Sequence, residues 1–124
     1  MGEKTRKNPV GTTDLLVRIV AVKGTCPIYK PGDSFWIRDG FRLQTVPGQS
    51  LCLHALSSLM PFYRALAGGV SPEEMGLPCR KGKGACVQCP DAVDFTDGGT
   101  VTFEILPVEN ALSEIQAEME PNAL

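Results

Sequence analysis

The sequence predicts a small single α+β domain with a short β-sheet and one central helix. Residues 14–23 (DLLVRIVAVK) and 100–106 (TVTFEIL) are rich in β-branched and aliphatic residues, which is typical of strands. Between them, residues 51–66 repeat apolar side chains at helical spacing. A length of 124 residues with 43% hydrophobic and 21% charged residues suits one globular domain.

The N-terminal half is expected to supply two strands. Residues 1–12 are polar and contain Pro9 and Gly11, so they are predicted to form a flexible lead-in. The first strand, residues 14–23, is expected to end at Gly24 and to be mostly buried. A loop with two prolines follows, and residues 34–38 (SFWIR) are predicted as a second, shorter strand.

The central helix is predicted from residue 51, with Ser50 as its N-cap and Gly68-Gly69 as its end. Pro61 removes a backbone donor from this segment, so a kink or two short helices are expected. Residues 71–75 (SPEEM) have the pattern of a brief helix. Residues 76–84 are rich in glycine and bases and are expected to form a solvated loop.

The C-terminal part is predicted to contain one short strand or turn at 85–89 and the alternating strand 100–106. Asn110 is a candidate cap for an acidic terminal helix that carries Leu112, Ile115 and Met119 on one side. The expected organisation is therefore a lead-in over 1–12, one α+β domain over 13–108, and an acidic helix or tail over 109–124.

Charge and hydropathy exclude several classes of function. The net charge is −2, with every Lys and Arg before residue 84 and only acids after it, so a nucleic-acid-binding protein is disfavoured. No segment has the length and apolar character of a membrane span. The first residues do not lead into the apolar core of a signal peptide, which predicts a cytoplasmic protein.

Five cysteines are the most informative feature of the composition. An odd number without an export signal does not indicate a disulfide framework; it indicates buried thiols, a metal or cluster site, or redox chemistry. Cys86 and Cys89 form a C-x-x-C pair, and a tight turn would bring both sulfurs to one side. A four-ligand site would need further thiols from distant loops, since Cys26, Cys52 and Cys79 have no such partner.

Two of the single cysteines have local features that suit a site. Cys26 lies in a proline-bounded turn directly after a strand, and Cys52 lies near the start of the central helix, where the helix dipole favours a thiolate. His54, the single histidine, follows two residues later. On a helix it would point roughly 200° away from Cys52, so the two are not expected to bind one ion unless that turn is not helical.

Several of these segments together resemble a family of small prokaryotic proteins of unknown function. The matching residues cover about 15–106 and follow the family's pattern C-P-x-[FY]-x-x-G-x-x-F, C-x-x-A, G-G, C-x-D and V-x-F. Here these pieces are Cys26 to Phe35, Cys52 to Ala55, Gly68-Gly69, Cys89 to Asp91 and Val101 to Phe103. The resemblance implies a common fold but no chemistry. It selects Cys26, Cys52 and Cys89 as pattern positions and leaves Cys79 and Cys86 outside.

The leading hypothesis is a metal or iron–sulfur site formed by Cys26, Cys52 and Cys89, with Cys86 as the fourth ligand. All-thiolate ligands suit an iron–sulfur cluster, and the ligand count suits zinc equally. The protein would be an accessory or electron-transfer subunit that works with a protein partner. The alternatives are a non-catalytic interaction subunit with structural cysteines and, third, a thiol enzyme with Cys52 as nucleophile and His54 or Asp91 as auxiliary. The lack of a base and oxyanion constellation counts against an enzyme.

Overall fold

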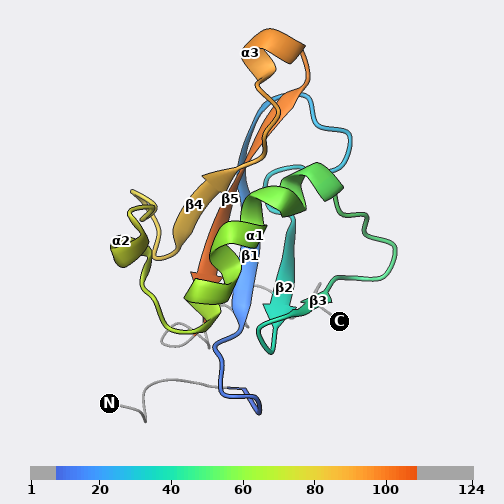
Figure 1. The fold of residues 1–124 in the computed structure, drawn as a ribbon. Helices are drawn as coiled ribbons and strands as arrows, with labels where there is room; N and C mark the ends of the chain where they lie inside the picture. The colour runs from blue at the N-terminus through green and yellow to red at the C-terminus, as the bar shows by residue number, and fades with distance from the viewer. Residues whose placement is uncertain (1–7, 109–124) are drawn as a thin grey trace.

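A computed structural model describes residues 8–108 as one antiparallel sheet of five strands with helices packed against it (Figure 1). The strand order is β3-β2-β1-β5-β4, so the two longest strands lie in the middle. The strands are β1 (Leu15–Gly24), β2 (Ser34–Arg38), β3 (Arg42–Gln44), β4 (Ala85–Gln88) and β5 (Gly99–Pro107). The helices are α1 (Leu53–Ala67), α2 (Pro72–Met75) and α3 (Val93–Thr96). The predicted small α+β domain with a short sheet is confirmed at this level.

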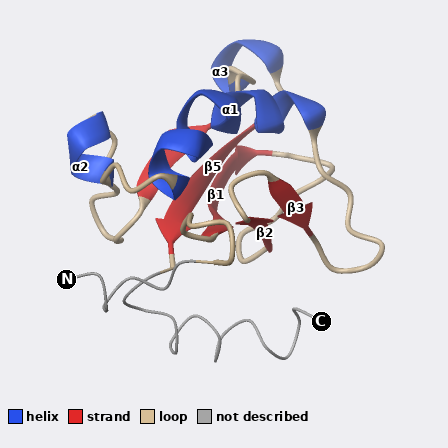
Figure 2. Cartoon of the chain, turned by 60° about the horizontal axis from the view of Figure 1, so that its bottom comes forward, coloured by secondary structure: helices blue, strands red, loops and turns tan. Residues whose placement is uncertain are grey.

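One face of the sheet carries the main core because side chains alternate along each strand. The odd-numbered residues of β5 from Val101 to Ile105 and of β1 up to Ile19 point toward α1 and are buried. The register of β1 shifts after Ile19, so that Val22 packs against the core while Ala21 and Lys23 are exposed. This core contains Leu15, Val17, Ile19, Phe35, Ile37, Ala55, Leu59, Leu66, Val101, Phe103 and Ile105. The view in Figure 2 shows α1 lying across this face of the sheet. The alternating residues Val101, Phe103 and Ile105 of the predicted strand 100–106 all lie on this face.

Helix α1 begins two residues later than its sequence pattern suggested. Its N-cap is Cys52, whose backbone is extended at φ −86° and ψ 122°, so Ser50 is not the cap. The helix continues through Pro61 as one element, and the alternative of two separate short helices is not observed. The predicted brief helix is α2, which begins with a capping box: Ser71 Oγ accepts from the Glu74 N–H, and Glu74 Oε1 accepts from the Ser71 N–H.

The first described residues are attached to β1. Asn8 Oδ1 accepts the N–H of Thr12, and Asn8 Nδ2 donates to Asp14 Oδ1 at 2.8 Å. Residues 8–12, which the sequence places in the lead-in, therefore form a hydrogen-bonded turn. Residues 1–7 of that lead-in and the predicted C-terminal helix at 109–124 lie outside the described residues.

Asp14 is expected to make the stability of the fold depend on pH. Burial alone raises the pKa of Asp14, but bonds from Asn8, the Asp39 N–H and Arg38 outweigh burial and hold it below its ordinary value of 3.8. The folded state therefore binds this proton less tightly than the unfolded chain, and the contribution is present above about pH 3.8 and lost as pH falls through the folded pKa. At pH 7, Asp14→Asn should reduce the free energy of unfolding by about 1–2 kcal/mol. Urea denaturation at several pH values should show the wild-type and variant curves converging in acid; a constant difference would contradict the assignment.

Candidate functional site

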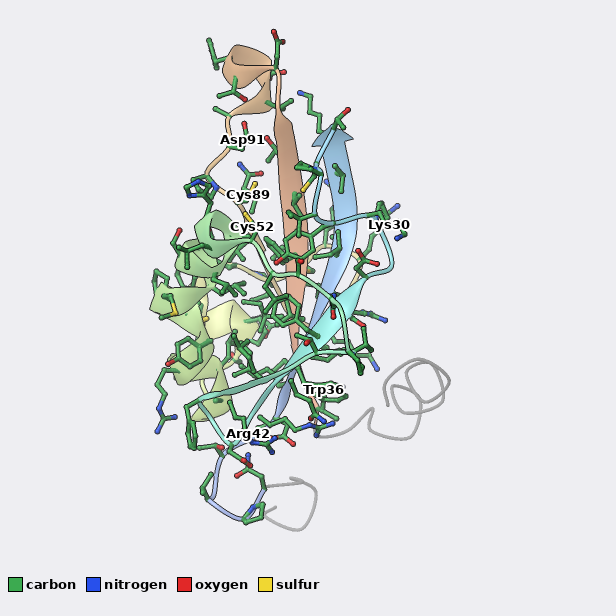
Figure 3. The ribbon with its side chains drawn as sticks, turned by 90° about the vertical axis from the view of Figure 1, so that its right-hand side faces the viewer. Lys30, Trp36, Arg42, Cys52, Cys89 and Asp91 are labelled. Atoms are coloured by element: carbon green, nitrogen blue, oxygen red, sulfur yellow. A yellow bond between two sulfur atoms is a disulfide. The ribbon has the colours of Figure 1, made fainter. Side chains whose placement is uncertain are left out.

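Three cysteines from distant parts of the sequence line one pocket of about 460 Å³. Cys26 follows β1, Cys52 precedes α1 and Cys89 follows β4, and the pocket lies where these three element ends meet. Figure 3 shows Cys52, Cys89 and Asp91 at the same end of the sheet. Of the four predicted metal ligands, the fold thus brings three to one place.

Cys26 is held by the turn that leaves β1. Its Sγ accepts the backbone N–H groups of Ile28 and Tyr29 at 3.4 Å and 3.3 Å. The turn is joined to β5 by a bond from the Thr25 N–H to the Gly98 carbonyl at 3.0 Å. Two N–H donors directed at one sulfur stabilise negative charge on it, and they also fix the direction in which the half-buried side chain points.

Cys52 is positioned through Tyr29. The Cys52 N–H, one of the free donors at the helix start, donates to Tyr29 Oη at 2.9 Å. Tyr29 is buried and packs edge-on against Phe103, with ring centroids 5.6 Å apart. Burial is the main reason that the pKa of Tyr29 lies above its ordinary value; the bond from Cys52 opposes it, and repulsion by thiolates at Cys52 and Cys26 adds to it. The phenol therefore stays neutral near pH 7.

Cys89 is the most deeply placed of the three. It follows the last residue of β4, and its backbone N–H bonds to the Val101 carbonyl at 2.9 Å. Its Sγ accepts the Val101 N–H at 3.2 Å and donates to the Gly99 carbonyl at 3.6 Å. The sulfur is thus bonded to the neighbouring strand while its side chain lines the pocket.

Cys86, the predicted fourth ligand, does not line this pocket. It forms a disulfide with Cys79, and the Cα atoms of the pair are 5.1 Å apart. The expected tight turn at C-x-x-C is absent because residues 85–88 form the extended strand β4. Ala85 points into the core, so Cys86 points to the opposite face, and residues three apart on a strand cannot direct both sulfurs to one side.

His54 shares the pocket with the three thiols, which the helical rotation argument did not anticipate. That argument assumed that Cys52 has helical backbone, whereas Cys52 is an extended N-cap. Asp91 lines the same pocket. Its pKa is lowered mainly by the bond from Thr96 Oγ1, then by the Gly99 N–H, and also by attraction to His54, while desolvation opposes these effects. The positions of His54 and Asp91 along the chain gave no indication that the two side chains would line the same pocket.

The thiols share the pocket without already having coordination geometry. Within residues 8–108, no three Cys, His, Asp or Glu side chains are spaced to hold a metal ion. Ligation would therefore need the ligating atoms to approach one another around the open volume that they border.

The basic loop predicted at 76–84 surrounds a carboxylate of the protein itself. Glu104 is buried, and its Oε2 accepts the N–H groups of Lys83 and Gly84 at 3.1 Å and 3.0 Å. Its Oε1 pairs with Arg18 at 3.1 Å. A side chain at Gly82 or Gly84 would collide with Glu104 or with the β5 backbone, so the two glycines allow this wrapping.

A second hollow, of about 360 Å³, lies between α1 and strands β2 and β3. Exposed apolar side chains border it, among them Phe41, Leu53 and Met60. No Cys, His, Asp or Glu lines this hollow, so it offers an apolar surface and no metal ligand.

Comparisons with protein-family models, with curated proteins and with solved structures find no match. The resemblance read from the sequence therefore stays a prediction. Among the described residues no helix has the length and apolar character needed to cross a membrane.

Proposed function

We propose that the protein binds one thiophilic metal ion through its free cysteines Cys26, Cys52 and Cys89, with His54 as the fourth ligand. The convergence of three distant cysteines on one pocket is the observation that carries this proposal. Unrelated structural cysteines would have no reason to meet at one pocket, since a free cysteine is most often an isolated small core residue.

The donor set favours a zinc-like ion over an iron–sulfur cluster. Three thiolates and one imidazole complete a tetrahedral zinc site. Iron–sulfur clusters generally use four cysteines, and Cys86 is paired with Cys79 on the other side of β4. Zinc has no redox chemistry, so the electron-transfer role belongs to the iron–sulfur alternative, and the accessory metal-binding role is the one that this donor set supports.

The surroundings of the ligands support the same proposal. Backbone N–H groups already bond to Cys26 Sγ and Cys89 Sγ, and such bonds stabilise ligating thiolates and fix their orientation. Asp91, whose carboxylate attracts His54, is the kind of acidic neighbour that orients a ligating imidazole. Closing the site requires loss of the Cys89 thiol proton, which is now directed at the Gly99 carbonyl.

Titration with Co²⁺ of the anaerobic, chelator-treated protein tests the proposal. We expect one ion per chain, with the intense thiolate-to-cobalt absorption and visible bands of tetrahedral cobalt, and we expect Zn²⁺ to displace it. Replacing any one of the three thiols by serine removes a direct ligand (Cys26→Ser, Cys52→Ser or Cys89→Ser). Loss of a residue that only supports a ligand weakens metal binding by about 10- to 100-fold, so each of these variants should weaken it by at least about 100-fold. His54→Gln should weaken binding by a smaller factor.

The matched control is the double variant Cys79→Ser/Cys86→Ser, which removes two sulfurs outside the pocket and should bind the ion unchanged. Equal weakening in that control would contradict the assignment of ligands. Folded protein that binds no metal and has one fast-alkylating thiol at Cys52 would favour the thiol-enzyme alternative. Metal-free protein with three inert thiols would favour the interaction subunit.

A further inference from the structure

The hollow between α1 and strands β2 and β3 presents apolar side chains to solvent. Leu53 and Met60 border it from α1, and Phe41 borders it from the turn before β3. These three side chains have 80%, 62% and 71% of their surface exposed. A single exposed apolar residue is ordinary, but several around one hollow mark an interaction site.

The hollow is present because one helix is too narrow to cover the whole sheet. Five strands at ordinary spacing are about 19 Å wide, whereas a helix with its side chains is about 10–12 Å across. Helix α1 packs on β1, β5 and β4, and β2 and β3 lie beside it (Figure 1). The sheet therefore leaves room next to α1 for about one further helix.

The side of α1 that borders the hollow suits a neighbouring helix. Leu53, Ser57, Met60 and Arg64 follow one another at intervals of three or four residues, so they form one row along α1. The first three line the hollow, and Arg64 continues the row by one turn. Rows of this kind pack into the grooves of another helix, and the small side chain of Ser57 leaves space between its two larger neighbours.

Arg64 gives this surface its charge. Its guanidinium lies at the turn between β2 and β3, where a Cβ atom on Gly40 would be 3.7 Å from Arg64 Nη1, and Phe41 follows in that turn. Arg42 nearby is paired with Asp39, but Arg64 forms no salt bridge with any other described residue. No acid lines the hollow. A complementary partner therefore carries a carboxylate at the end of its apolar strip.

We propose that this surface binds an amphipathic α-helix of a partner protein, with the apolar side of that helix in the hollow and an Asp or Glu paired with Arg64. A pocket for a small molecule buries about 70–90% of its ligand, whereas the side chains around this hollow are mostly exposed, so a broad apolar surface fits it better. A second copy of the chain would bring another Arg64 but no acid, since α1 contains none.

This surface is independent of the proposed metal site, although both use α1. His54 lines the cysteine pocket, whereas its neighbour Leu53 lines the hollow. Met60 and Arg64 do not line the cysteine pocket. Met60→Ser and Arg64→Glu should therefore leave Co²⁺ binding unchanged.

Selection from a display library of randomised helical peptides on the full chain tests the proposal. We expect the enriched peptides to share apolar residues at helical spacing and an Asp or Glu at one end. Fluorescence anisotropy of one enriched, labelled peptide should show binding weakened at least about tenfold by Met60→Ser, which removes an apolar contact, and by Arg64→Glu, which opposes two acids. Replacing the acid of the peptide by Lys should restore its binding to Arg64→Glu.

The matched control is Phe95→Ser, which removes an exposed ring outside the hollow and should leave peptide binding unchanged. Met60 and Arg64 are exposed, so their substitution leaves the core intact. The proposal is overturned if no peptide is enriched, if Phe95→Ser weakens binding equally, or if Lys in the peptide fails to restore it. Sedimentation of the chain alone should show a monomer; a dimer that Met60→Ser dissociates would assign the surface to a second copy and overturn the proposal.

Discussion

Phe103→Ala is expected to lower the free energy of unfolding by about 3–5 kcal/mol, because it leaves a ring-sized cavity in the main core. Phe103 is fully buried on β5, which pairs with both β1 and β4. The strands on both sides hold the backbone in place, so a shift of one neighbouring side chain cannot fill the cavity. Chemical denaturation monitored by circular dichroism measures this loss.

The same substitution should also disturb the cysteine pocket. The Phe103 ring supports Tyr29, and Tyr29 Oη accepts the N–H at the N-cap of α1. Loss of the ring frees Tyr29 to move, so Cys52 should react faster with an alkylating reagent under conditions where the variant is still folded. A faster reaction at Cys52 in the folded variant would identify this route, and an unchanged rate at Cys52 would contradict it.

Phe95→Ala is the matched control, since Phe95 has 91% of its surface exposed and belongs to the short helix α3. It should change the free energy of unfolding by no more than about 0.5 kcal/mol. Similar losses in the two variants would show that Phe103 is not a supporting element of the core.

The strands were the most predictable part of this fold. Segment 100–106 alternates and segment 14–23 is rich in Val, Ile and Leu, and both patterns are typical of strands, so β1 and β5 lie within one residue of the predicted positions. The strand β3 was not predicted, because its three residues carry no period and owe their pairing to the preceding turn at Asp39-Gly40. The short helix α3 was missed for the same reason: four residues are too few to show a period.

The sequence predicted the three thiols of the candidate site but not His54, its proposed fourth ligand. Cys26, Cys52 and Cys89 all adjoin an element end, and element ends meet where the sheet stops. Cys86 was placed with them because C-x-x-C suggests a turn, yet four extended residues send its sulfur to the other face. His54 was set aside because the start of α1 was placed too early. One residue of extended backbone at Cys52 decides whether the two side chains diverge or converge.

Gly99→Ala is expected to lower the stability of the fold and to disturb the cysteine pocket. The start of β5 and the turn after β1 approach each other at Gly99 more closely than a side chain allows. A Cβ atom at residue 99 would lie 2.5 Å from the Thr25 carbonyl oxygen and 2.9 Å from the Cys26 nitrogen. These are backbone atoms, so the β1 turn itself must move, and overpacking of this kind costs about 1–3 kcal/mol. The movement carries Cys26 away from Cys89, whose Sγ bonds to the Gly99 carbonyl.

The matched control for this variant is Gly68→Ala, at the C-cap of α1, where φ is −85° and the nearest atom to a new Cβ lies at 3.4 Å. It should alter stability by no more than about 0.5 kcal/mol. Gly99→Ala should in addition weaken Co²⁺ binding and raise the alkylation rate of Cys26, and neither effect should follow from Gly68→Ala. Destabilisation by Gly99→Ala with unchanged Co²⁺ affinity would mean that the approach of β5 to the Cys26 turn holds the sheet together but does not set the spacing of the thiols.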